Sequence, residues 1–252
     1  MIRAGGDFDY DLKGAGYAGH RRPDPRIEAL VHTALGDART VLNVGAGSGS
    51  YEPTDRHVIA IEPSAQMRAQ RPAHRPAIVG FAETLPLDDD AVDAAMGIYT
   101  VHQWADPERG LAELRRVTRG PVVIMTGDAE AFDRLWVADY APELLSAEAK
   151  RAPSVAFIAE RIGAHVEVLT VPVPLDCADG FLEAFYGRPE RLLEPAVRKA
   201  QSSWGFVGPD VEARFVETLS ADLASGRWDE RHGHLRTQPT FEGALRLIVG
   251  RP

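Results

Sequence analysis

Short runs of consecutive apolar residues recur along the chain and alternate with longer segments of mixed character. One run is Val122-Val123-Ile124-Met125, which lacks polar alternation and is therefore typical of a strand covered on both faces. The intervening segments are long enough to hold helices, so the pattern predicts a parallel sheet with right-handed crossover connections. The predicted strands lie near residues 40–44, 57–61, 76–80, 92–98 and 121–126, followed by 165–171 and 241–249.

Helical segments are predicted between and after these strands. They cover residues 26–35, 107–118, 130–150 and 155–162. Residues 176–239 separate the last two predicted strands and contain three more helical segments, at 181–186, 189–204 and 210–225. Ligands of open α/β sheets bind beyond the carboxyl ends of the strands, and we expect this insertion to form a helical cap there. The alternative is a decoration on the edge of the sheet, remote from the site.

Composition limits the class of protein. A chain of 252 residues that is 44% hydrophobic can bury one full core, which favours a single α/β domain over residues 1–252 with an insertion. A net charge of −9 argues against a nucleic-acid partner. The lone Cys177 excludes a disulfide framework or a cysteine zinc site. Without a basic, apolar leader or a run of 18 apolar residues, we expect a cytoplasmic protein that does not enter membranes, as a monomer or homodimer.

Glycines follow the first predicted strand at alternate positions, in Val44-Gly45-Ala46-Gly47-Ser48-Gly49-Ser50. Such glycines allow a sharp turn and let backbone N–H groups approach a ligand. The dinucleotide fingerprint requires a glycine or alanine at position 50, where this chain has Ser50. The spacing found here resembles the first motif of class I S-adenosylmethionine (SAM)-dependent methyltransferases.

Three further segments strengthen this resemblance. The second predicted strand ends in Glu62, where a carboxylate can accept both hydrogen bonds of a ribose diol; the alternative role is to stabilise the start of the next helix. The segments 79–86 and 91–104 then follow in order. Together they resemble the ubiquinone and menaquinone biosynthesis type (methyltransferase type 11) of small-molecule methyltransferase, over roughly residues 26–126. The resemblance implies a Rossmann-like seven-stranded sheet of order 3-2-1-4-5-7-6 with an antiparallel last strand.

The resemblance also implies a donor site for SAM, which becomes S-adenosylhomocysteine as methyl is transferred. The implied donor-site residues are Asn43, Gly45, Ala46, Gly47, Gly49, Glu62, Pro63, Met67, Phe81, Ala82, Glu83, Ile98 and Tyr99. Two of them depart from the family pattern. Asn43 stands where the family carries an acid, which places in doubt an ion pair to the methionine ammonium group. Phe81 stands where an aspartate often reaches the adenine amine. Met67 fits adenine packing or ordinary core equally well.

The amino-terminal segment Tyr17-Ala-Gly-His20-Arg21-Arg22 resembles an arm that folds over SAM in these enzymes. We therefore expect residues 1–25 to form an arm over the donor site, with Tyr17 and Arg21 closing on it. An arginine there can neutralise the SAM carboxylate through a bidentate pair. The alternative is a solvated basic turn before the first long helix.

On the acceptor side, the candidate catalytic residues are His102 and Tyr99, which follow the fourth predicted strand. A histidine titrates near working pH and suits general base catalysis; the alternative is that His102 only braces its loop. A group of aromatic residues either lines an acceptor pocket or belongs to the core: Trp136, Tyr140, Tyr186 and Trp204. His232 and His234 make a poor metal site because no firm third ligand accompanies them, so no metal is expected.

The predicted function is methyl transfer from SAM to a small-molecule acceptor, by in-line displacement at the sulfonium methyl. Two alternatives remain open at this point. One is a SAM-binding protein that does not methylate, whether cyclase-like or regulatory. The other is a nicotinamide-dependent Rossmann oxidoreductase, against which Ser50 and the lack of a second mononucleotide-binding half both count.

Overall fold

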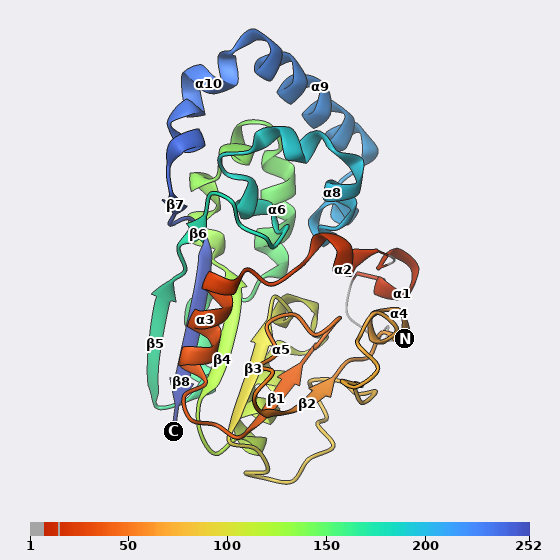
Figure 1. Cartoon of the computed structure of the whole chain (residues 1–252), viewed down its shortest axis with the longest axis vertical. Coiled ribbons are helices and arrows are strands. Elements are labelled where there is room, and N and C mark those ends of the chain that lie inside the picture. Colours follow the sequence, from red (N-terminus) through yellow and green to blue (C-terminus); the bar gives the residue numbers. More distant parts are fainter. Residues whose placement is uncertain (1–7, 15) are drawn as a thin grey trace.

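The computed structural model describes residues 8–14 and 16–252, and a sheet of six strands forms its centre (Figure 1). The strand order is β2-β1-β3-β4-β8-β5, in which β8 is antiparallel to both β4 and β5 and the other pairs are parallel. The strands are β1 (Thr40–Val44), β2 (His57–Ile61), β3 (Ala94–Ile98), β4 (Val122–Gly127), β5 (His165–Thr170) and β8 (Leu245–Arg251). This confirms the predicted mostly parallel sheet with an antiparallel last strand.

The third predicted strand, at 76–80, is reduced to a single parallel bridge between Ile61 and Ile78. Pro76 has no N–H to donate, and at the edge of the sheet Ile78 and Val79 are exposed and gain little from packing. The bridge keeps the segment beside β2 through Ile78 N–H to Ala60 O and Glu62 N–H to Ile78 O. Counting this position, the order matches the predicted 3-2-1-4-5-7-6.

Helices cover both faces of the sheet, which explains the continuous apolar runs. Successive strand residues alternate between two hydrophobic cores: Val41 packs with α3 (Pro25–Ala34), whereas Leu42 belongs to the core that α5 (Pro107–Val117) and α7 (Val155–Ile162) cover. Each helix begins where a side chain accepts a hydrogen bond from a first-turn N–H. The three capping residues are Asp24, Asp106 and Ser154.

A second layer of helices gathers beyond the carboxyl ends of the parallel strands, at the top of Figure 1. It comprises α6 (Pro142–Arg151), α8 (Pro195–Lys199), α9 (Pro209–Ser225) and α10 (Arg227–His232). The predicted helices 130–150 and 189–204 are wrong as single elements, because Pro142 and Pro195 each begin a new helix. The predicted last strand also divides: β7 (Thr240–Phe241) pairs with β6 (Val173–Pro174), and β8 starts after it.

The remaining elements are short. Three α-helical turns lie on the β2 side of the sheet (Figure 1): α1 (Tyr10–Lys13), α2 (Tyr17–His20) and α4 (Ala65–Arg68). The 3₁₀ helices are η1 (Val101–Gln103), η2 (Ala129–Arg134), η3 (Trp136–Asp139), η4 (Leu182–Phe185), η5 (Pro189–Leu193), η6 (Ser202–Phe206) and η7 (Gly233–Thr237). Within residues 8–14 and 16–252, every helix is too short or too polar to cross a bilayer.

Candidate functional site

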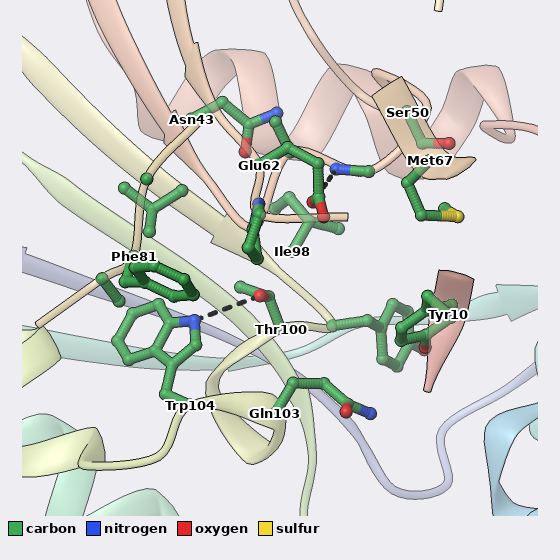
Figure 2. Close-up of a pocket in the computed structure, with 18 of the residues that line it drawn as sticks. Tyr10, Asn43, Ser50, Glu62, Met67, Phe81, Ile98, Thr100, Gln103 and Trp104 are labelled. Carbon is green, nitrogen blue, oxygen red and sulfur yellow. Dashed lines mark hydrogen bonds between the residues drawn. The ribbon is translucent and has the colours of Figure 1, made fainter. Parts of the chain in front are cut away.

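A cavity of about 670 Å³ opens at the carboxyl ends of β1, β2 and β3. Its volume lies within the usual range for small-ligand sites. Most of the predicted donor-site residues line it: Tyr17, Arg21, Asn43, Gly45, Ala46, Gly47, Glu62, Pro63, Met67, Phe81, Ala82, Glu83, Ile98 and Tyr99. Two predicted residues, Gly49 and His102, are not among the residues that line this cavity. Figure 2 shows part of its wall.

The glycine-rich loop is shaped by backbone conformation and close packing. Gly45 has φ +67°, and a Cβ at this position would lie 1.8 Å from Thr100 Oγ1, so no other residue fits without moving the chain. The Thr100 hydroxyl is itself held by Trp104 Nε1–H at 3.1 Å (Figure 2). Gly47 also has positive φ. The loop therefore presents bare main chain to the cavity, as the alternate glycines predicted.

Glu62 lies at the end of β2 with its carboxylate inside the cavity (Figure 2). Its Oε2 accepts a hydrogen bond from Gly47 N–H and its Oε1 accepts one from Ser64 N–H, each at 2.8 Å. Burial raises the pKa of Glu62, and these two N–H groups offset part of that rise. Each oxygen keeps a free lone pair, because a carboxylate has about four acceptor positions. The group can therefore accept two further donors on neighbouring ligand atoms.

A buried ion pair beneath the loop was not predicted from the sequence. Arg71 Nη2 donates to both carboxylate oxygens of Glu52 at 2.8 Å, and both side chains are at most 2% exposed. Arg71 Nη1 also donates to the carbonyls of Ala46 and Gly47 at 3.3 Å. The guanidinium group thus ties the loop to the ion pair. Its parts are 19 residues apart, and no local sequence signal marks them.

The same carboxylate orients Asn43. Asn43 Nδ2 donates to Glu52 Oε1 at 2.9 Å, and a carboxylate only accepts, so the amide nitrogen must face Glu52. The amide oxygen of Asn43, which lines the cavity, is then the atom offered to a ligand. Gly49 lies on the other side of this ion pair, where a Cβ would approach Glu52 Oε2 and Arg71 Nη1 to 3.2 Å. Gly49 therefore makes room for the ion pair.

The amino-terminal segment and the insertion meet in the wall of the cavity. Arg21 Nε donates to Asp179 Oδ1 at 2.6 Å, and Arg21 Nη1 donates to the Tyr17 hydroxyl at 2.9 Å. The Tyr51 hydroxyl donates to Asp179 Oδ2 at 2.9 Å. Asp179 is only 2% exposed, and its carboxylate binds two side chains from distant parts of the chain, Tyr51 and the Arg21 that contacts Tyr17. Asp179 was missed because it lies 158 residues from Arg21.

Tyr99, immediately after β3, is held against this cluster. It has φ +52°, an unusual conformation for a residue with a Cβ. The Arg21 guanidinium lies 5.3 Å from the centre of its ring, and the ring of Phe181 lies 5.4 Å away. Burial raises the pKa of the Tyr99 phenol, and the negative charge of Glu183 raises it further. The phenol therefore stays protonated at neutral pH and can donate a hydrogen bond.

A second cavity of about 110 Å³ adjoins the first, because Tyr10, Tyr17, Arg21 and Tyr99 line both. His102 lines this second cavity. The two predicted catalytic residues therefore lie on the same side of the site, with Tyr99 at the boundary between the cavities.

The four aromatic residues considered for an acceptor pocket line neither cavity. Trp136 packs on Tyr140 with ring centres 5.6 Å apart, Trp204 packs on Phe215 at 4.9 Å, and Tyr186 stacks on Phe241. All four belong to the core shared by the helical layer and one face of the sheet. The pocket alternative is therefore wrong for these residues.

The two histidines lie on short helices, since His232 ends α10 and His234 belongs to η7. His232 Nε2 lies 3.0 Å from Asp139 Oδ2. Within the described part of the chain, no three histidine, cysteine or acidic side chains gather as a metal site would require.

Comparisons with known proteins agree with this geometry. Residues 42–125 match the model of a methyltransferase domain family. An uncharacterized methyltransferase from Mycobacterium tuberculosis is 37% identical over 105 residues, which span 39% of this chain and 43% of the relative. A crystal structure from Anabaena variabilis, described as a methyltransferase from an antibiotic biosynthesis pathway, is 30% identical with a TM-score of 0.84, covering 92% of this chain and 98% of that one. The chain belongs to the class I SAM-dependent methyltransferases.

The fold itself is shared more widely. The [4+2]-cyclase SpnF has a TM-score of 0.54 at 17% identity over 96% of this chain and 93% of its own. Such a likeness extends to the fold alone. Membership of the methyltransferase family decides against the nicotinamide alternative.

The cavity of this family member fits its cofactor, SAM. Two glycines, Gly45 and Gly47, leave main chain bare where a ligand can approach closely. Glu62 retains acceptor positions for a ribose diol, and Asn43 offers an amide oxygen to an ammonium group. Phe81 supplies an apolar face beside Ala82. The residues present therefore suit both the polar and the apolar parts of the cofactor.

Proposed function

We propose that this protein transfers a methyl group from SAM to a small-molecule acceptor. The main support for this proposal is that two cavities adjoin. The larger one fits the donor, and the smaller one shares the lining around Tyr99 with it. An enzyme that holds two reactants in line needs such a junction, because much of the rate comes from positioning.

Bound SAM supplies an electrophilic methyl group on a sulfonium centre. We assign its binding to the chain's own groups as follows. The backbone of Gly45 and Gly47 contacts the donor, and Glu62 accepts the ribose hydroxyls. Asn43 takes the ammonium group through its oxygen, which Glu52 turns toward the cavity. An acid at position 43 would make an ion pair with the ammonium group, whereas Asn43 accepts its hydrogen bond through an uncharged oxygen.

We further propose that the amino-terminal arm and the insertion at 176–239 close the site together. The contact that supports this is the buried ion pair between Arg21 and Asp179, which both line the cavity. Gly180 N–H also donates to His20 O at 3.0 Å, so the two segments pair through their backbones. Closure of this kind keeps water away from the sulfonium centre. Water would otherwise compete with the acceptor as a nucleophile.

Tyr99 and His102 are the proposed groups beside the reacting atoms. The protonated Tyr99 phenol would donate to the acceptor and position it, whereas His102 would take a proton from the nucleophile. The loop-bracing role of His102 is the competing explanation. A His102→Gln variant that keeps both its fold and its turnover would support bracing.

Calorimetry with S-adenosylhomocysteine and NAD tests the donor assignment. We expect the adenosylhomocysteine to bind with micromolar affinity and NAD to give no signal. Glu62→Gln should weaken binding of the former about tenfold, because charge-assisted hydrogen bonds to the ribose contribute about 1.5–3 kcal/mol. Glu130→Gln, an exposed carboxyl outside the cavity, is the matched control and should change nothing.

A second measurement separates methyl transfer from donor binding alone. A panel of small acceptors is incubated with protein and SAM carrying a labelled methyl group, and labelled products are counted. Tight adenosylhomocysteine binding without transfer to any acceptor class, protein included, would favour the non-methylating alternative. Transfer to protein or nucleic acid only would contradict the proposed small-molecule acceptor.

A further inference from the structure

The second cavity has a size that restricts its occupant. A dry cavity of about 150 Å³ in another protein accommodates benzene, so a cavity of about 110 Å³ limits its occupant to at most a single ring. Its walls are largely apolar and come from three regions of the chain. The apolar contributors are Phe132, Leu135, Leu145, Phe181 and Leu182. A flat, apolar body suits such a lining.

One polar side chain in this lining has no partner. Gln201, just before η6, is 5% exposed, and neither its amide nitrogen nor its amide oxygen makes a hydrogen bond. No other described residue that lines either cavity has a buried side-chain nitrogen or oxygen without a partner. Burying an amide in this way costs free energy unless a ligand or water completes the bonds.

Two other partly buried glutamines show the contrast. Gln70 donates to the Gly14 carbonyl and accepts from Ala18 N–H, and Gln238 donates to the Thr240 carbonyl. Both lie outside the second cavity. Gln201 differs from these two glutamines because it lines the second cavity and its amide has no hydrogen-bond partner.

From this we propose that the acceptor is a ring compound whose edge carries a hydrogen-bond donor next to an acceptor, as a lactam does. The amide of Gln201 pairs with that edge: its oxygen accepts from the ring N–H, and its nitrogen donates to the ring carbonyl. This proposal rests on the proposed function and names the substrate class of the same site.

The pairing also orients the substrate. Tyr10, Tyr17, Arg21 and Tyr99 line both cavities, whereas Gln201 lines the second cavity only. A single ring held by its lactam edge at Gln201 directs its other edge toward the shared wall. The methylated atom is then a ring substituent on the side away from the lactam.

The test uses the protein saturated with S-adenosylhomocysteine and two probes that share a ring hydroxyl. 4-Hydroxy-2-pyridone has the lactam edge and phenol lacks it. NMR titration should show the pyridone binding about tenfold more tightly than phenol, as expected for two neutral hydrogen bonds at a buried site. Gln201→Leu, which keeps the volume and removes the amide, should bring the two affinities together. Equal affinities for the unaltered protein would overturn the proposal.

The thermal stability of the variants gives an independent readout. Because the Gln201 amide is unpaired without a ligand, Gln201→Leu should leave the melting temperature unchanged or raise it. The matched control Gln238→Leu removes a made hydrogen bond, so it should lower the melting temperature and keep the tenfold preference. A clear fall in the melting temperature of Gln201→Leu would mean that the amide is structural, and this would contradict the proposal.

Adenosylhomocysteine binding distinguishes failure of the proposed methyltransferase function from failure of the proposed role of Gln201. The unaltered protein, Gln201→Leu and Gln238→Leu should all bind adenosylhomocysteine equally, since neither substitution touches the donor cavity. Loss of this binding in the unaltered protein would overturn the proposed function itself. Normal donor binding with a pyridone preference that persists in Gln201→Leu would overturn only the role of Gln201.

Discussion

The donor cavity and the second cavity differ in how their polar groups are satisfied. Around the glycine-rich loop, Asn43, Glu52, Glu62 and Arg71 all have hydrogen-bond partners within the protein. In the second cavity, Gln201 has none, and Glu183 is a buried carboxyl with a raised pKa. Each of these donor-side groups is thus held by the protein before any ligand arrives, whereas the acceptor side keeps an amide with no partner.

This difference has a physical basis. The donor is a fixed, charged molecule with many polar groups, and a prearranged site lowers the cost of ordering around it. An unpaired amide in an apolar pocket discriminates between ligands, because a ligand without a complementary hydrogen-bonding edge leaves the amide unpaired and binds more weakly. Specificity is therefore expected to lie in the helical insertion, and affinity for the donor in the sheet.

The largest effect is expected on the donor side, at the ion pair beneath the loop. Arg71→Met leaves Glu52 buried with only Asn43 as a partner, and breaking a buried pair in this way costs about 3–5 kcal/mol. Urea unfolding should show this loss, and donor affinity should fall because Arg71 also holds the loop carbonyls. The contrasting surface pair is Arg214 and Glu143, where Arg214→Met should change the free energy of unfolding little, because both side chains are about half exposed.

The double variant Glu52→Leu, Arg71→Met sharpens this prediction. Removing both charges leaves neither uncompensated, so the double variant should be more stable than Arg71→Met alone. If Arg71→Met costs no more than Arg214→Met, the ion pair does not organise the loop, and the prearranged character of the donor side is wrong.

The sequence predicted the donor side far better than the acceptor side, and chain distance explains why. Gly45, Glu62 and Tyr99 each follow a strand, so a local pattern places them at one edge of the sheet. The acceptor side is built from Phe132, Phe181 and Gln201, which only the tertiary fold brings together. Inside the insertion, a single proline can end one helix and begin the next. The helical periodicity extends across such a proline, so it predicted one long helix where the structure has separate ones.

The next largest effect concerns Glu183, whose backbone partner is Ala244 N–H, at 3.0 and 3.1 Å from the two carboxylate oxygens. Burial raises its pKa from the usual 4.5 to about 7, against the opposing influence of Ala244 N–H and of Arg246. Between these values the folded protein binds a proton that the unfolded chain has released. The stabilisation from this group is therefore complete below pH 4.5 and lost as the pH rises through 7.

Glu183→Gln removes that titration and isolates its contribution. Relative to the variant, the unaltered protein should lose about 1.4 kcal/mol of unfolding free energy per pH unit in the middle of the window. Urea unfolding at several pH values between 4.5 and 8 measures the difference. Parallel stability curves for the two proteins would show that Glu183 titrates as an ordinary surface carboxyl.

The smallest effect is expected where the two regions meet, at the contact between Arg21 and Asp179. Asp179→Asn keeps the shape of the side chain and removes the charge that Arg21 contacts at 2.6 Å. Because Arg21 and Tyr17 line the donor cavity, adenosylhomocysteine affinity should fall about tenfold or less, equivalent to about 1.4 kcal/mol. Asp176→Asn is the matched control, since that carboxylate is 81% exposed and pairs with Arg26.

A double-mutant cycle with Arg21→Met decides the cause. If the arm and the insertion close the site as one unit, the double variant should lose little more donor affinity than either single variant. Additive losses would mean that the two residues act separately, and the insertion would then have no part in holding the donor.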